Sequence, residues 1–253
     1  MNTGPVDRAP PAASIRACPS PNHGARRIGP IDMIVLHYTG MPDADQALAW
    51  LCSEQSEVSA HYFVFEDGRI VQMVEEDRRA WHAGAASWAG ETDINSRSIG
   101  IEIANFGHDG ALPPFPDAQI DAVIGLCRDI TDRHALPAHR LLAHSDVAPG
   151  RKRDPGEAFP WIRLAGEGIG HWIEPEPVCG DRFLAPGDEG EPVAALQALL
   201  ALYGYRLEIS GVFDDRTGHV VTAFQRHFRP EKVDGIADTS TLATLHRLLA
   251  ALL

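Results

Sequence analysis

Apolar residues along this chain gather in short runs, and several of these runs end in one polar residue. Ile31–Gly40 is an apolar run that leads to a histidine, and Ser98–Asn105 is a β-branched run that holds one glutamate. A third run, Leu141–Ala143, is followed at once by another histidine. Runs of this kind are typical of strands that are covered on both faces. The pattern therefore predicts a buried sheet whose strands deliver polar side chains to one place.

Four further segments have recognisable patterns. Asp117–His134 carries apolar residues at helical spacing, and Asp43–Cys52 is predicted to form a short helix. Tyr62–Val74 has two apolar stretches around an acidic turn that contains glycine, which predicts a hairpin. Met1 to about Ser20 is rich in proline, alanine and arginine, which predicts a loosely ordered arm.

The character of the chain changes near Glu174–Gly190, which is acidic and rich in proline and glycine. We expect a linker in the first part of this segment. Beyond it, Asp214 with Thr217 and Asp238 with Thr241 have the spacing of helix N-caps. The predicted organisation is an arm over 1–20, a first domain over 21–173, a linker over 174–181 and a second domain over 182–253.

The composition is that of an ordinary globular protein, with 44% hydrophobic and 23% charged residues among 253. The formal net charge is −13 and no basic stripe occurs, which argues against nucleic acid and anionic membrane as partners. No apolar run approaches the roughly eighteen residues of a membrane span. The four cysteines form no CxxC pair, so no zinc ribbon is predicted. Their disulfide status and the oligomeric state stay open.

The candidate chemistry centres on His144–Trp161, HSDVAPGRKRDPGEAFPW, because sites usually lie on loops that follow buried strands. His144 and Asp154 suit a loop that folds back on a shared ion, and both ligand types approach zinc at roughly 2.0–2.2 Å. His37 offers a third ligand from the first run, and Glu102 offers a spare carboxylate. Together they predict a zinc site that keeps one position open for water.

The motifs VLHYTG, SAHYFVFEDGRIVQMV, AWHAG, SIGIEIAN and AHSDVAPGRKRDPGEAFPW occur in this order between about Ile28 and Trp172. In content and order they resemble the zinc-dependent N-acetylmuramoyl-L-alanine amidases of the type-2 family, the AmpD/AmiD group. The resemblance implies an α/β fold with a mixed central sheet flanked by helices, and one zinc ion per chain. It maps the zinc ligands onto His37, His144 and Asp154, the catalytic glutamate onto Glu102 and the catalytic lysine onto Lys152.

The resemblance implies hydrolysis of the amide between the lactyl group of N-acetylmuramic acid and L-alanine, in bacterial peptidoglycan or muropeptides. Zinc would polarise the carbonyl, Glu102 would move protons and Lys152 would steady the oxyanion, although a solvated loop lysine is the alternative for Lys152. A non-catalytic peptidoglycan-recognition module on the same fold is the alternative function, but such modules typically lack a zinc ligand. Candidate substrate contacts are Tyr38, Trp81, His82, Asn105 and Arg151.

Residues from about Arg182 to Leu253 resemble the small three-helix peptidoglycan-binding domain of cell-wall hydrolases. The resemblance implies binding to wall, and a purely structural appendage is the alternative. Wall lies outside the cell, whereas no segment near Met1 is apolar enough for a secretory signal. We expect a cytoplasmic location, with the periplasm as the alternative. We also expect truncation near Glu174 to spare activity on soluble muropeptides.

Overall fold

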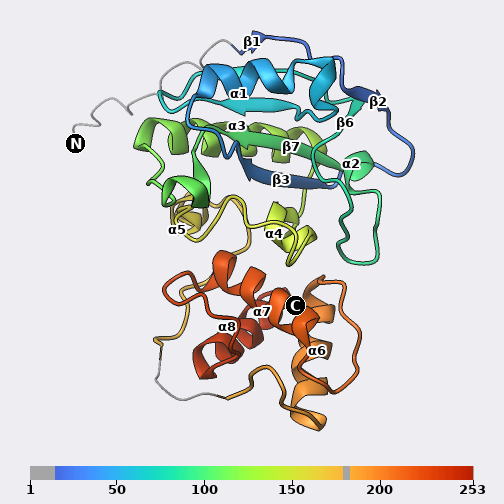
Figure 1. The fold of residues 1–253 in the computed structure, drawn as a ribbon, viewed down its shortest axis with the longest axis vertical. Coiled ribbons are helices and arrows are strands. Elements are labelled where there is room, and N and C mark those ends of the chain that lie inside the picture. Colours follow the sequence, from blue (N-terminus) through green and yellow to red (C-terminus); the bar gives the residue numbers. More distant parts are fainter. Residues whose placement is uncertain (1–14, 179–182, 253) are drawn as a thin grey trace, which may run out of the picture.

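The computed structural model describes residues 15–178 and 183–252, as a sheet domain and a helical domain (Figure 1). Its strands are β1 Arg16–Ala17, β2 His23–Ala25, β3 Met33–Tyr38, β4 Tyr62–Val64, β5 Ile70–Gln72, β6 Arg78–Ala80, β7 Ser98–Ile103 and β8 Leu141–Ala143. Its α-helices are α1 Ala44–Leu51, α2 Ile94–Arg97, α3 Asp117–His134, α4 His144–Val147, α5 Trp161–Gly166, α6 Glu191–Tyr203, α7 Asp215–Phe228 and α8 Thr239–Ala250. Three 3-10 turns complete it, η1 Glu54–Ser56, η2 Gly107–Gly110 and η3 Ala138–Arg140. Within these ranges, no helix combines the length and the apolar character that crossing a bilayer requires.

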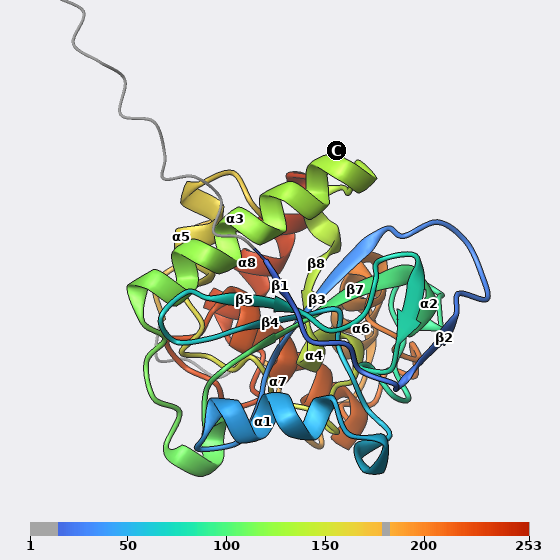
Figure 2. The ribbon, with the colours of Figure 1, turned by 90° about the horizontal axis from the view of Figure 1, so that it is seen from above.

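A six-stranded sheet organises the first domain, in the order β1-β5-β4-β7-β3-β8. Strands β4 and β5 pair antiparallel as the predicted hairpin, whereas β4, β7, β3 and β8 run parallel. A second sheet pairs β2 with β6. Figure 2 shows the strands of the large sheet between α3 on one side and α1 on the other. The predicted mixed central sheet flanked by helices is therefore confirmed.

The register between β3 and β7 decides which side chains share a face of the sheet. His37 lies opposite Glu102, and Leu36 lies opposite Ile101. Side chains alternate between faces, so the two polar residues share one face and the two apolar residues share the other. Leu36 and Ile101 pack in one cluster with Val123 and other buried residues of α3. A slip of one residue would send His37 and Glu102 into that core, so burial fixes the register of the site.

Two local predictions differ from the structure. The sequence predicts an arm over 1–20, but Arg16–Ala17 pairs with β5 as a parallel edge strand and Ser20 is buried. A strand of two residues is too short to show a period in the sequence. Residues 1–14 lie outside the described ranges. The sequence also predicts a loop from His144 onward, whereas His144 opens the one-turn helix α4, which is too short for a helical pattern.

The cysteines in the described ranges are free thiols. Cys127 is buried on α3, as its place in the helical pattern predicts. The sulfur atoms of Cys18 and Cys52 lie 3.5 Å apart, so β1 and the end of α1 meet there. Cys179 lies outside the described ranges.

The second domain contains α6, α7 and α8, the three helices that the resemblance implies. Asp214 caps α7 by accepting a hydrogen bond from the Thr217 N–H at 2.8 Å. Asp238 caps α8 by accepting one from the Thr241 N–H at 2.8 Å. Both predicted helix starts are confirmed, because an N-cap carboxylate satisfies an N–H that has no partner inside its helix.

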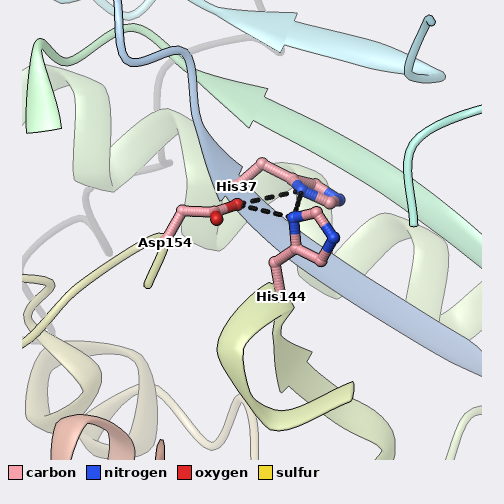
Figure 3. A group of neighbouring side chains, drawn as sticks. All are labelled: His37, His144 and Asp154. Carbon is pink, nitrogen blue, oxygen red and sulfur yellow. Dashed lines mark hydrogen bonds and ion pairs between the residues drawn. The ribbon is translucent and has the colours of Figure 1, made fainter. Parts of the chain in front are cut away.

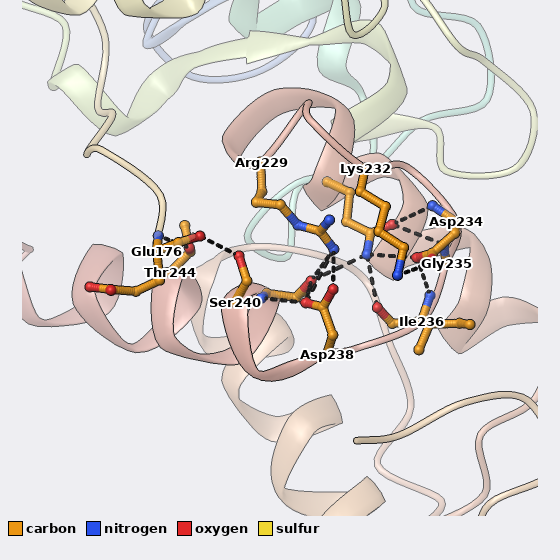
Figure 4. A network of polar contacts seen from close by, with 11 residues as sticks. Glu176, Arg229, Lys232, Asp234, Gly235, Ile236, Asp238, Ser240 and Thr244 are labelled. Carbon is orange, nitrogen blue, oxygen red and sulfur yellow. Dashed lines mark hydrogen bonds and ion pairs between the residues drawn. The ribbon is translucent and has the colours of Figure 1, made fainter. Parts of the chain in front are cut away.

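The segment 174–178, where we expect the linker to begin, lies along α8 rather than free in solvent (Figure 4). The Ser240 hydroxyl donates to the Glu176 carbonyl at 2.6 Å, and Arg247 pairs with the Glu176 carboxylate at 2.6 Å. The proline and glycine content of this segment does not reveal these partners, because they come from side chains far along the chain. Residues 179–182 lie outside the described ranges.

The two domains share one hydrophobic core. Val35 and Trp88 of the first domain are buried in the same cluster as Tyr203 and Phe224 of the second. The Trp88 and Tyr203 rings meet edge to face, with centroids 6.1 Å apart. Truncation near Glu174 would expose this apolar surface to water. The expectation that the first domain keeps its activity alone stays a prediction.

A buried carboxylate joins the domains beside this core. Asp146 on α4 has no exposed surface. It accepts a hydrogen bond from the Tyr205 hydroxyl at 2.7 Å and one from Nδ1 of His227 at 2.6 Å. Both donors belong to the second domain, and His144 begins the same short helix as Asp146. The second domain therefore holds the helix that carries one predicted zinc ligand.

Replacing Tyr205 with phenylalanine is expected to lower the free energy of unfolding by about 2 kcal/mol, because hydrogen bonds to charged groups contribute roughly 1.5–3 kcal/mol. Urea denaturation of the metal-loaded protein measures it. Tyr203→Phe is the matched control, since within the described ranges its hydroxyl bonds only to His171, at 2.8 Å, and a neutral hydrogen bond contributes roughly 0.5–1.5 kcal/mol. An equal fall in the free energy of unfolding in the two variants would contradict a stronger hydrogen bond between Tyr205 and the Asp146 carboxylate.

Candidate metal centre and catalytic cavity

Three buried polar side chains converge where β3, α4 and the loop after α4 meet (Figure 3). Nδ1 of His37 lies 2.8 Å from Nδ1 of His144 and 3.1 Å from Oδ2 of Asp154. Nδ1 of His144 lies 2.9 Å from the same Oδ2. The three ligand atoms are mutually close enough to hold one metal ion. The structure thus brings together the three residues that the sequence predicts as metal ligands.

A backbone carbonyl fixes the proton of His144. Nε2 of His144 lies 3.1 Å from the Ala83 carbonyl oxygen, which can only accept a hydrogen bond. Nε2 therefore carries a proton, which leaves Nδ1 as the nitrogen that can coordinate a metal ion.

A chain of hydrogen bonds fixes the proton of His37 in the same way. The Ser98 hydroxyl donates to the Ile94 carbonyl at 2.6 Å, so its oxygen accepts from Nε2 of His82 at 3.1 Å. Nδ1 of His82 then accepts from Nε2 of His37 at 3.0 Å. Nδ1 of His37 is left with a lone pair. Burial, together with His144, lowers the pKa of His37 to about 4, so the ring is neutral at neutral pH.

Two lone pairs and a carboxylate that face one another repel unless a cation lies among them. The separations of 2.8–3.1 Å are near the roughly 3.3 Å edge of a tetrahedron with metal–ligand bonds of about 2.0–2.1 Å. Two imidazole nitrogens and one carboxylate oxygen therefore fit a zinc ion.

A cavity of about 370 Å³ opens beside the three ligands, and we call it the catalytic cavity. Glu102 lines it from β7, and within the described ranges its buried Oε2 has no hydrogen-bond partner. Burial, followed by the charge of Asp154, raises the pKa of Glu102 well above its usual value. Lys152 lines the same cavity. A carboxyl group with a raised pKa can take up and release a proton near neutral pH.

Three of the five predicted substrate contacts line the catalytic cavity, namely Tyr38, His82 and Arg151. The Tyr38 hydroxyl bonds to His108 at 3.0 Å, which holds the ring at the cavity wall. His82 orients His37, so its ring acts on the metal site through that residue. Direct contact of these side chains with substrate stays a prediction.

The other two, Trp81 and Asn105, are not among the residues that line this cavity. The Asn105 amide donates to the Pro113 carbonyl at 2.9 Å and accepts from the Gly107 N–H at 2.8 Å, so it shapes its own loop. A Cβ atom at Gly24 in the β2–β6 sheet would lie 4.0 Å from the Trp81 indole nitrogen. Neither residue lines this cavity, so contact of Trp81 and Asn105 with substrate stays a prediction.

Two residues that the sequence analysis does not single out support the site. A Cβ atom at Gly100 would lie 2.5 Å from the His82 ring, so only glycine lets this ring lie flat on β7. Ser98 orients His82 through its hydroxyl. Both residues alternate with the isoleucines of β7 and so share a face with Glu102. This alternation is visible in the sequence and could have identified them.

His61 is buried behind the site in its neutral form. Nδ1 accepts from the Gly100 N–H at 2.9 Å, and Nε2 donates to the Arg78 carbonyl at 3.1 Å. Burial, followed by the charge of Arg26, lowers the pKa of His61 to about 3. A second proton would break the Gly100 contact, so His61 supports β7 as a core histidine.

The stability contributed by neutral His61 should disappear in acid. The pKa is about 3 when folded and about 6.5 when unfolded, so between these values the unfolded chain binds more protons and stability falls as the pH falls. Compared with His61→Asn, the wild type should lose up to about 1.4 kcal/mol more per pH unit within that window. Urea melts at several pH values measure it, with the exposed His246→Asn as the control. Parallel curves for wild type and His61→Asn would refute it.

Residues 27–157 match the family described as "N-acetylmuramoyl-L-alanine amidase", and residues 189–245 match that described as "Putative peptidoglycan binding domain". Over 233 residues, 87% of this chain and 82% of the relative, the chain is 41% identical to N-acetylmuramoyl-L-alanine amidase AmiD of Escherichia coli. It is 34% identical to 1,6-anhydro-N-acetylmuramyl-L-alanine amidase AmpD of Enterobacter cloacae, over 59% of this chain and 87% of that one.

Two solved structures resemble the whole chain. Escherichia coli AmiD in complex with the substrate anhydro-N-acetylmuramic acid-L-Ala-D-γ-Glu-L-Lys has a TM-score of 0.74 and 38% identity, over 97% of this chain and 93% of that one. AmpDh3 of Pseudomonas aeruginosa in complex with anhydromuramic pentapeptide has a TM-score of 0.72 and 30% identity, over 100% and 99%. With its predicted motifs gathered around one cavity, this chain belongs to the N-acetylmuramoyl-L-alanine amidase family and is a hydrolase of that class.

Proposed function

We propose that this chain cleaves the amide between N-acetylmuramic acid and L-alanine with one zinc ion, held by His37, His144 and Asp154. The observation that carries the proposal is the pair of Nδ1 atoms, 2.8 Å apart, beside the Asp154 carboxylate. Three ligands with an open position are the catalytic zinc arrangement. When bound there, zinc polarises the scissile carbonyl and lowers the pKa of a bound water to about 7.

Glu102 moves the proton in this reaction. Its carboxyl group lies on the same sheet face as His37 and lines the catalytic cavity. The raised pKa of Glu102 lets the group accept a proton from the attacking water and pass it to the leaving nitrogen of L-alanine. The water's oxygen then forms the new carboxylate, and the peptide leaves with a free amine. A pure recognition module would have no use for such a carboxyl group in this place.

Lys152 is suited to the oxygen on which negative charge develops. It lines the catalytic cavity from the loop just before Asp154. An ammonium group that donates to the carbonyl oxygen stabilises the charge of the tetrahedral stage. A lysine in this position acts as a donor and leaves the metal ligands to the two histidines and the aspartate.

The substrates that we propose are muropeptides, including the anhydro form. The supporting observation is that AmiD and AmpDh3, which resemble the whole chain, are solved with anhydromuramyl peptides. Binding of intact wall by the second domain is a further proposal, which the family match of residues 189–245 supports.

The direct test is an assay of the zinc-loaded protein on anhydro-N-acetylmuramoyl-L-Ala-D-γ-Glu-L-Lys, with intact sacculi in parallel. We expect mass spectrometry to show release of the tripeptide with a free alanine amine. A zinc chelator should stop the release, and added zinc should restore it. Binding of the muropeptide without any release of peptide would instead establish a recognition module.

A cytoplasmic location stays a prediction. Fractionation of the source cells with an antibody to this protein tests it. Recovery mainly with periplasmic markers would overturn it and would make intact wall the favoured substrate.

A further inference from the structure

We propose that the second domain completes the substrate site, with Arg206 and Arg216 binding carboxylates of the peptide that is released. This proposal rests on the proposed function. A hollow of about 440 Å³, which we call the interdomain hollow, is lined by both domains. Arg151 lines both the interdomain hollow and the catalytic cavity, so the two spaces adjoin at this side chain. Arg206 and Arg216 line the interdomain hollow from the second domain.

The lining of the interdomain hollow is positively charged. It includes three arginines and no aspartate or glutamate. The hydrogen bonds that Arg151 and Arg216 make within residues 15–178 and 183–252 go to carbonyls, those of Ala83 and Ala85 for Arg151 and that of Arg206 for Arg216. In the same ranges none of the three arginines forms an ion pair. On a chain with a net charge of −13, three cations without a carboxylate among them make a local site for an anion.

The arginines of the second domain are held in place relative to the metal ligands. Arg206 follows Tyr205, whose hydroxyl is anchored on the buried Asp146. Arg216 donates to the Arg206 carbonyl at 2.9 Å, so the Arg216 side chain is tied to the backbone next to Tyr205. Asp146 and His144 lie on the same turn of helix. The interdomain hollow is therefore preorganised, which reduces the entropy lost when a ligand binds.

The ligand chemistry that fits is a peptide with free carboxylates. In a γ-linked glutamate the side-chain carboxyl forms the peptide bond, which leaves the α-carboxylate free, and the end of the peptide carries another. A peptide whose alanine amide lies in the catalytic cavity can extend past Arg151 into the interdomain hollow. Guanidinium groups bind carboxylates through paired hydrogen bonds, which gives the contact direction as well as charge.

The experiment compares two substrates in the wild type and in two double variants. The first substrate is anhydro-N-acetylmuramoyl-L-Ala-D-γ-Glu-L-Lys, and the second is the same molecule with its free peptide carboxylates converted to primary amides. The test variant is Arg206→Gln with Arg216→Gln. The control is Arg128→Gln with Arg163→Gln, which removes the same charge from two arginines of the first domain that pair with Glu167, Asp117 and Asp121.

We expect the test variant to raise KM for the carboxylate substrate about tenfold, or about 1.4 kcal/mol, with kcat little changed. The wild type should prefer the carboxylate substrate to the amide by a similar factor, and the test variant should lose this preference. The control variant should keep it. A KM that stays at the wild-type value, or that rises equally for both substrates, would overturn the proposal.

Failure of this inference is distinct from failure of the proposed function. If the wild type cleaves neither substrate, the proposed function is wrong. The arginine site is then tested by calorimetry, which measures the Kd of the wild type for the same two molecules. Equal Kd values for the carboxylate and amide forms would then overturn the arginine site on its own ground.

Discussion

Replacing Asp154 with alanine is expected to remove bound zinc and activity together while the chain stays folded. Three protein ligands are the usual number in an open catalytic zinc site, and the two lone pairs that remain would face each other without the carboxylate. Zinc should fall from about one per chain to near zero. Activity should fall by more than the roughly 10–100-fold that is typical of partners behind the ligands. Elemental analysis and the muropeptide assay measure the two quantities.

His37→Ala and His144→Ala should behave like Asp154→Ala, because each removes one Nδ1 lone pair from the same centre. Asp109→Ala is the matched control, since its side chain is 80% exposed and its only ion pair within the described ranges is with Arg153 at 3.4 Å. It should keep both zinc and activity. Stoichiometric zinc in the His144→Ala protein would show that the ligand assignment is wrong.

Three residues of the site are predictable because each lies on, or directly after, a strand with a recognisable apolar pattern. His37, Glu102 and His144 each follow or interrupt an apolar run, and parallel strands β7, β3 and β8 are neighbours in the sheet. Buried parallel strands must be continuously apolar, so a single polar residue at their ends stands out. Asp154 lies in an irregular loop and becomes a candidate only through the motif that surrounds it.

The contacts between the domains are not predictable from local patterns. Asp146 lies 59 residues from Tyr205 and 81 from His227 along the chain, and its neighbours Ser145 and Val147 give no sign that it is buried. A buried carboxylate needs partners, but the sequence does not say which segment supplies them. The composition near Glu174 predicts a linker between two domains, but it does not reveal the carboxylate and the common core through which the domains meet.

The roles of polar and aromatic residues in loops are also not predictable from local sequence patterns. Asn105 follows a strand directly and Trp81 lies in a loop rich in small residues, which are features of binding sites and of loop-stabilising residues alike. The Asn105 side chain bonds to backbone groups of its own loop, and the sequence does not reveal these partners.

Glu102→Gln is expected to keep zinc and fold while kcat falls by roughly 10²–10⁴-fold, the usual contribution of general acid–base catalysis. The amide has nearly the shape of the carboxyl group, so packing on β7 should persist. It cannot take the proton from water, so bond cleavage loses its proton carrier. The free energy of unfolding should not fall, because the buried carboxyl has an Oε2 without a partner in the described ranges.

The same variant separates a proton carrier from a metal ligand and from a purely structural residue. A carrier predicts full zinc occupancy, a nearly unchanged KM for the anhydromuropeptide and a large loss of kcat. A ligand predicts loss of zinc, as in Asp154→Ala. A structural residue predicts lower stability with kcat close to wild type. Glu102→Asp is a second test, because it keeps the carboxyl group but shortens the side chain by one methylene. Its kcat should lie between those of wild type and Glu102→Gln, because proton transfer requires a hydrogen-bond distance of about 2.6–3.2 Å. A wild-type kcat in Glu102→Gln would move proton transfer to another group in the catalytic cavity.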